Sequence, residues 1–119
     1  MKRSASVVAV TGELDVSTTA QWDEDVQAAA RRSPAVVLDL SRVHFVDSAG
    51  VRTLFRWVQS AARRGVLVVV VAPHDGPLWR LLDILDLESV APICDSRKDA
   101  LEAVKGPGEP GPLRSMQAA

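Results

Sequence analysis

The tetrapeptide Asp47-Ser48-Ala49-Gly50 is the segment of this 119-residue sequence whose residue types and spacing best suit a chemical role. Serine is among the preferred helix N-cap residues, because its hydroxyl accepts a hydrogen bond from a free N–H of the first turn. A helix N-terminus also favours negative charge, so the same serine could carry a regulatory phosphate. The tetrapeptide by itself favours the simpler role of Ser48 as a helix cap, and Gly50 allows another chain to approach that turn closely.

Catalysis is not indicated by the residues around Ser48. A serine nucleophile needs a base, and we interpret His44 as a solvated loop residue and Asp47 as a residue that shapes the loop. The sequence has no G-x-x-x-x-G-K-[ST] loop and no G-x-S-x-G elbow. Cys94 is the single cysteine, and the two histidines are thirty residues apart. We therefore expect no enzyme activity, no cofactor and no metal site.

A buried strand and a helix must hold the tetrapeptide between them. Residues 35–40 read AVVLDL, an apolar run typical of a strand covered on both faces. We expect a loop over residues 41–47 and a helix that begins at Ser48 and is capped at its end by Gly65. The residues predicted to form the buried side of this helix are Val51, Leu54, Phe55, Val58 and Ala62.

The rest of the chain continues the alternation of strand and helix. Strands are predicted over residues 6–11, 66–72 and 90–93, and helices over 18–32, 77–85 and 96–104. Thr18 with Gln21, and Ser96 with Asp99, fit capping boxes. Trp57 and Trp79 fall off the best apolar faces of their helices. This order predicts one α/β sandwich with a mostly parallel sheet of about four strands flanked by about four helices.

Charge and composition argue against several other classes of function. Fourteen Lys and Arg against fifteen Asp and Glu give a net charge of -1, so no basic excess indicates a nucleic-acid partner. The longest apolar run, residues 66–72, is too short to cross a bilayer, and no signal peptide is evident. We expect a cytoplasmic protein without direct membrane insertion. Its domain is predicted to span residues 1–105, followed by a flexible Pro/Gly-rich tail at 106–119.

Three segments in order carry a family resemblance: TGELD at 11–15, VLDLS at 37–41 and FVDSAG at 45–50. Together they resemble the STAS domain family, in particular the bacterial anti-sigma factor antagonists. The resemblance implies a sheet flanked by helices and a partner switch. In that switch the unphosphorylated domain binds an anti-sigma factor that is itself a serine kinase, and a sigma factor is released. Phosphorylation of the serine after the motif aspartate, here Ser48, ends the binding, and a PP2C-type phosphatase restores it.

The resemblance also implies a partner-binding surface around the motif, with two departures. Antagonists often continue the motif with Leu-Gly, where this sequence has Val51-Arg52, and they often carry another strand ahead of the TGELD segment. Arg52 could select a different kinase or pair with the phosphate. Asp15 could orient the loop near the serine or meet the partner. The predicted surface comprises Asp15, Asp47, Ser48, Ala49, Gly50, Val51 and Arg52.

The sequence is also compatible with two other functions. The same fold could serve as a constitutive STAS interaction subunit of a transporter or of a stress-signalling complex. The helix N-terminus near Ser48 could also bind a small anion or nucleotide, although a Gly-rich phosphate loop is lacking. The sequence leaves a homodimer open as well.

Overall fold

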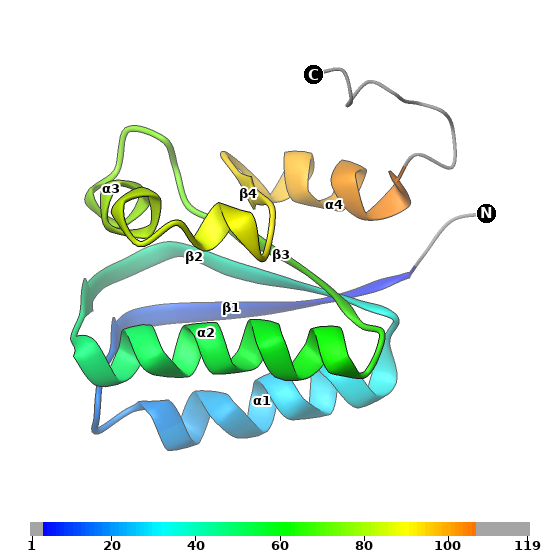
Figure 1. Ribbon diagram of the computed structural model, residues 1–119, viewed down its shortest axis with the longest axis horizontal. Helices are drawn as coiled ribbons and strands as arrows, with labels where there is room; N and C mark the ends of the chain where they lie inside the picture. The colour runs from blue at the N-terminus through cyan, green and yellow to red at the C-terminus, as the bar shows by residue number, and fades with distance from the viewer. Residues whose placement is uncertain (1–3, 107–119) are drawn as a thin grey trace.

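The computed structural model describes residues 4–106 and shows strands and helices in alternation (Figure 1). The sheet has the order β1-β2-β3-β4, and each neighbouring pair is parallel, which confirms the predicted α/β fold. Of the tail predicted at 106–119, all but Gly106 lies outside the described residues. The elements are β1 (Ala5–Leu14), α1 (Thr19–Arg32), β2 (Ala35–Val46), α2 (Ser48–Arg63), β3 (Leu67–Val71), α3 (Pro77–Ile84), the 3-10 turn η1 (Leu87–Ser89), β4 (Ile93–Cys94) and α4 (Arg97–Lys105).

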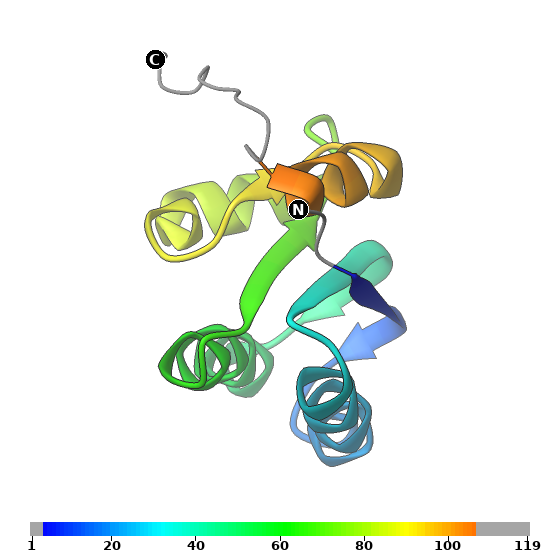
Figure 2. The same cartoon turned by 90° about the vertical axis from the view of Figure 1, so that its right-hand side faces the viewer.

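The helices are divided unequally between the two faces of the sheet. Val36 and Leu38 of β2 pack in one core with residues of α1, α2 and α3, whereas Val37 packs in a second core with α4. Successive strand residues point to opposite faces, so this alternation assigns each core to one face. Figure 2 shows α4 across the sheet from the other three helices. The continuous apolar character of residues 35–40 is thereby explained, because both faces of β2 are covered there.

β2 is longer than the sequence predicted. The expected loop over residues 41–47 is wrong, since the strand continues to Val46 and pairs there with Leu14 at the end of β1. The register between β1 and β2 shifts twice, between Ala9 and Thr11 and between Gly12 and Glu13. Such irregularities break the alternation of apolar and polar side chains. The polar residues that suggested a loop are therefore exposed side chains of an extended strand.

The buried side of α2 agrees with the prediction only in part: Leu54 and Val58 are buried as expected, but Trp57 is buried as well. Trp57 lies in the core at 1% exposure, and its indole N–H donates a 2.8 Å hydrogen bond to Asp23 of α1. Ala62, expected inside, is exposed. The neighbouring helix α1 explains the difference, because its carboxylate satisfies the polar end of a large buried ring. The buried residues of α2 are Gly50, Thr53, Leu54, Trp57, Val58 and Ala61.

A buried carboxylate ties β2 to α4. Asp39 is 7% exposed, and its Oδ2 accepts a 2.9 Å hydrogen bond from Nε of Arg97 and forms an ion pair with Nη2 of the same residue, also at 2.9 Å. Its Oδ1 accepts from the backbone N–H and the hydroxyl of Ser41. Burial by itself would raise the pKa of Asp39, but the Ser41 hydrogen bonds and the Arg97 charge outweigh it and hold that pKa below its usual value.

Replacing Arg97 is expected to give a pH-dependent loss of stability. Arg97→Met should lower the free energy of unfolding at pH 7 by about 1 kcal/mol, a modest loss because the Arg97 side chain is half exposed. The lowered pKa of Asp39 means that its carboxylate stabilises the fold at neutral pH and stops doing so as the pH falls through that pKa. The difference in urea unfolding between wild type and mutant should therefore be smaller in acid, below the usual pKa of aspartate, than at pH 7. Lys98→Met, an exposed change on the same helix, is the control, and an equal loss at both pH values would contradict the argument.

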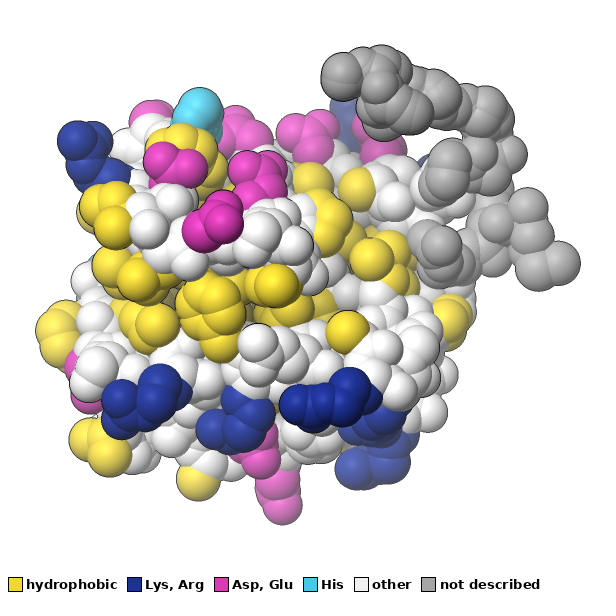
Figure 3. Space-filling model, viewed as in Figure 1, with side chains coloured by type: hydrophobic (Ala, Val, Ile, Leu, Met, Phe, Trp, Pro, Cys, Tyr) yellow, Lys and Arg dark blue, Asp and Glu magenta, His cyan; other side chains and the backbone are white. Residues whose placement is uncertain are grey.

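The surface between α2 and the α3–η1 segment is unusually apolar. Figure 3 shows a band of hydrophobic side chains there, with Lys and Arg side chains along one side and Asp and Glu along the other. Ile84, Leu85 and Val90 in this region are 71%, 38% and 45% exposed. No helix within residues 4–106 has the length and apolar character needed to span a membrane.

Candidate functional site

One carboxylate organises the junction between β1, β2 and α2. Asp47 is the N-cap of α2, and its Oδ1 accepts a 2.8 Å hydrogen bond from the backbone N–H of Gly50. Its Oδ2 accepts a 3.2 Å hydrogen bond from the backbone N–H of Val16, 31 residues earlier in the chain. Asp47 therefore joins the start of the helix to the loop that follows β1. These two hydrogen bonds are the means by which Asp47 shapes the loop.

Ser48 is not the cap that the tetrapeptide favoured. It is the first residue of α2, its side chain is exposed, and its hydroxyl makes no hydrogen bond with any part of the chain between residues 4 and 106. Asp47 occupies the cap instead, since aspartate and serine are both preferred there. The Ser48 hydroxyl therefore does not cap α2, and it is open to solvent at the helix N-terminus.

Gly50 is required by close packing rather than by an unusual backbone angle. A Cβ atom added at Gly50 would lie 2.0 Å from the backbone oxygen of Leu14, far inside any permitted contact. The same Leu14 oxygen accepts a hydrogen bond of 3.3 Å from the backbone N–H of Asp47. The end of β1 thus rests directly on the first turn of α2, so the close approach at Gly50 is made by this protein's own strand and not by another chain.

Asp15 shapes the loop beside this turn. Its Oδ1 accepts hydrogen bonds from the backbone N–H and hydroxyl of Ser17 and from the backbone N–H of Thr18. The Ser17 hydroxyl is the largest influence, and these bonds together lower the pKa of Asp15. The predicted capping box of Thr18 and Gln21 is wrong, because the Thr18 hydroxyl donates to the backbone oxygen of Glu13. The loop presents Val16 to solvent at 75% exposure.

The structure brings together the residues that the sequence singled out. Asp15 reaches the junction through the loop that Asp47 holds, and the remainder follow one another through the first turn of α2. Ala49 and Val51 are half-buried, whereas Arg52 is exposed and forms no ion pair with the residues that the structure describes. Arg52 lies about one turn beyond Ser48, so its guanidinium can approach a group attached to that serine.

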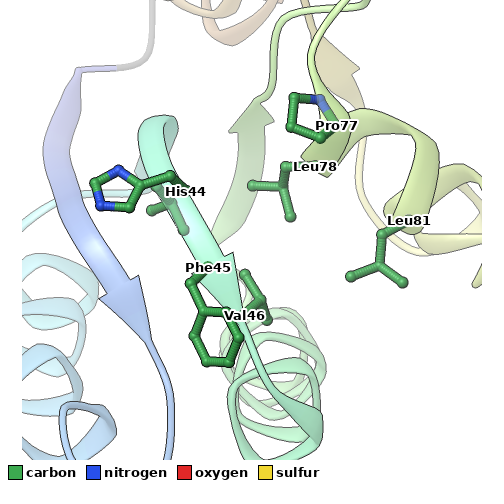
Figure 4. Close-up of a pocket in the computed structure, with 7 residues that line it drawn as sticks. His44, Phe45, Val46, Pro77, Leu78 and Leu81 are labelled. Atoms are coloured by element: carbon green, nitrogen blue, oxygen red, sulfur yellow. The ribbon is translucent and has the colours of Figure 1, made fainter.

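An apolar hollow beside the tetrapeptide escaped the sequence analysis. It has a volume of about 170 Å³ and lies between the end of β2 and α3. Leu78 and Leu81 of α3 point toward the last residues of the strand (Figure 4), and Phe45 at its rim is 53% exposed. Phe45 was the one residue of the sequence that could have indicated the hollow. Nothing in the sequence, however, paired Phe45 with a helix about thirty residues away. The lining residues are Val43, His44, Phe45, Val46, Pro77, Leu78 and Leu81.

Removing the Asp47 carboxylate is expected to loosen this junction. Asp47→Ala should reduce the free energy of unfolding by about 1–2 kcal/mol, the usual effect of losing an N-cap. It should also speed amide hydrogen exchange at Val16 and Gly50, whose N–H groups lose their acceptor. Asp47→Ser is the matched control, because serine keeps a capping oxygen for Gly50 with a shorter reach toward Val16. Unchanged exchange at Val16 in Asp47→Ala would rule out the bridging role.

The comparisons with known proteins agree with the fold and the motif. Residues 2–100 match the family model of the STAS domain. A Paenibacillus polymyxa protein named anti-sigma F factor antagonist is 31% identical over 103 residues, which cover 83% of this chain and 86% of that protein.

Solved structures extend the comparison. A structure of an anti-sigma factor antagonist from Mycobacterium paratuberculosis is 31% identical, with a TM-score of 0.72 and coverage of 84% of this chain and 85% of that one. A sulfate transporter family protein from Wolinella succinogenes, 17% identical, shares the fold with a TM-score of 0.73 over 85% of this chain and 84% of that one. The family match spans most of the sequence and includes the Asp47–Gly50 junction, so the chain belongs to the STAS domain family and is similar within it to anti-sigma factor antagonists.

Proposed function

We propose that this protein is an anti-sigma factor antagonist that binds an anti-sigma factor with serine kinase activity and is switched off by phosphorylation of Ser48. The observation that carries the proposal is the free, exposed hydroxyl of Ser48 at the start of α2. A cap serine would be occupied by its own helix, but Asp47 takes that role here. The relatives named as antagonists support the assignment of partner class.

A phosphate on Ser48 would be tolerated within the folded protein. The helix dipole and the N–H groups of the first turn favour an anion at this position. The neighbouring Asp47 carboxylate opposes it, and the exposed Arg52 one turn along offers compensation. The phosphate would add a charge of about -1.5 to -2 to the surface. Its effect on binding then arises in the complex, through steric exclusion or repulsion by carboxylates of the partner.

The surface around Ser48 has the composition of a docking face. We define the docking face by three exposed residues near the junction, Val16, Phe45 and Ser48, and by the hollow beside Phe45. Exposed apolar side chains next to a concave site are typical of protein-binding surfaces. The hollow, at about 170 Å³, has room for one apolar side chain of the partner. A dianion at Ser48 would then stand inside the contact area.

The phosphorylation step is tested directly with the cognate kinase. The purified protein, incubated with that kinase and ATP, should gain one phosphate by intact-mass spectrometry and lose it to a PP2C-type phosphatase. Ser48→Ala should gain none. Ser89→Ala, which removes another exposed serine, should be modified like wild type. Full phosphorylation of Ser48→Ala would remove Ser48 from the proposal.

Phe45 is expected to contribute strongly to partner binding. Phe45→Ala should raise the Kd for the kinase about tenfold, because an exposed aromatic beside a hollow is a typical anchor. Stability should change little, since the ring is 53% exposed. Leu101→Ala on α4, an exposed apolar side chain away from the docking face, is the control for calorimetric titration. Wild-type affinity in Phe45→Ala would exclude the hollow from the interface.

A further inference from the structure

A second surface, which follows α3 beyond the hollow of the docking face, has the features of an interface. We call it the apolar band: the exposed Ile84, Leu85 and Val90 of the α3–η1 side, together with Phe55 and Ala62 of α2. Large exposed apolar patches on a folded domain mark contact sites. Figure 3 shows the band running across the face that α2 and α3 share.

Opposite charges border the apolar band on its two sides. The outer stripe of α2 carries the exposed Arg52, Arg56 and Arg63, which recur at helical spacing on one face. The α3–η1 side carries exposed carboxylates. Arg56 is engaged by Asp23 of α1, whereas Arg63 forms no ion pair within the described residues. The carboxylates on the opposite side are Asp83, Asp86 and Glu88.

The band also has a projection and a recess. Ile84, the last residue of α3, is 71% exposed. A hollow of about 460 Å³ lies beside the second half of α2, where Val58, Ala62 and Val90 contribute its apolar walls. Figure 1 places α3 at one end of this face and the second half of α2 toward the other. Ile84 and the hollow therefore lie at different positions along the band.

We propose that the apolar band is a self-complementary interface that binds a second copy of this chain. A two-fold axis that runs along the band would set the arginine side of one copy against the carboxylate side of the other, twice. A uniformly acidic or basic partner would meet like charge on one side, whereas an identical copy meets opposite charge on both.

Sedimentation velocity of the full chain tests the proposal over a wide concentration range. Wild type should show a reversible monomer–dimer equilibrium. Ile84→Asp should raise the dimer Kd at least about tenfold, because it places a charge within an apolar contact. Leu101→Asp, the same kind of change outside the band, should leave the Kd unchanged. Each variant is checked for folding by circular dichroism.

Charge-reversal variants test the proposed charge pairing across the dimer more specifically. Arg63→Glu and Glu88→Arg should each weaken self-association, because each creates two like-charge contacts in a symmetric dimer. An equimolar mixture of the two variants should recover association to nearly the wild-type level, since the mixed dimer has opposite charges at both contacts. A wild type that stays monomeric at every concentration, or a mixture no stronger than its parts, would overturn the proposal.

Discussion

Phosphorylation of Ser48 is expected to weaken binding of the anti-sigma kinase by at least about tenfold, which corresponds to about 1.4 kcal/mol. The melting temperature should stay nearly the same, because the phosphate lies at a helix N-terminus whose field favours it. Calorimetric titration of the two forms measures the affinity, and thermal unfolding measures the stability. Ser48→Asp should reproduce part of the loss, since it adds less charge and bulk than a phosphate.

The extent of the structural change separates a surface switch from a conformational one. Amide spectra of the two forms should differ mainly around Asp15, Val16 and residues 47–54, the segments joined by the Asp47 carboxylate. Widespread change, or a large fall in melting temperature, would indicate that phosphorylation rearranges the fold. Equal affinity of both forms would reject the switch and favour a constitutive interaction subunit of the same fold.

Gly50→Ala should be among the most damaging small substitutions in the chain. Its added methyl group would lie 2.0 Å from the Leu14 backbone oxygen, so β1 and α2 must move apart. Overpacking against backbone costs about 3 kcal/mol, which for a domain of this size lowers the melting temperature by about 10 °C. Thermal unfolding followed by circular dichroism measures the change. Partner affinity should fall as well, because the docking face is built on this junction.

Gly76→Ala is the matched control for that substitution. A Cβ atom there would lie 3.3 Å from the Pro73 backbone oxygen, a contact that a small shift relieves. Neither glycine has a positive φ, so the two variants differ in the space around the methyl group and not in backbone strain. A small loss of stability in Gly50→Ala, similar to that of Gly76→Ala, would show that the junction is loose.

Local signals in the sequence were sufficient for the order of the elements. Apolar runs predicted the strands, although the fourth, predicted over residues 90–93, overlaps β4 only at Ile93. Helical periodicity predicted the helices, and Ser96 caps α4 through the backbone N–H of Asp99 as expected. The parallel sheet followed from the alternation. These features depend on neighbours within a few residues, which is the range over which a single sequence is informative.

The errors occur where distant segments decide the outcome. β2 extends to Val46 because β1 supplies a partner there, and Trp57 is buried because Asp23 of another helix accepts its N–H. The cap of α2 is shifted by one residue because Asp47 can also bind Val16, a contact across 31 residues. The sequence located the Asp47–Gly50 segment correctly but not the division of roles within it. The hollow beside Phe45 required knowledge of where α3 packs.

The order of strands in space follows their order along the chain, which bears on how the protein is made. Each strand pairs only with its neighbours in sequence, so every ladder closes over a single intervening helix. Among parallel sheets this arrangement keeps the sequence separation of paired strands as short as a helical crossover allows, which favours faster folding than an order with more distant pairings. A chain that emerges from the ribosome can add one strand–helix unit at a time to an edge already formed. The junction at Ser48 would be complete once α2 has been synthesised, before β3 is available.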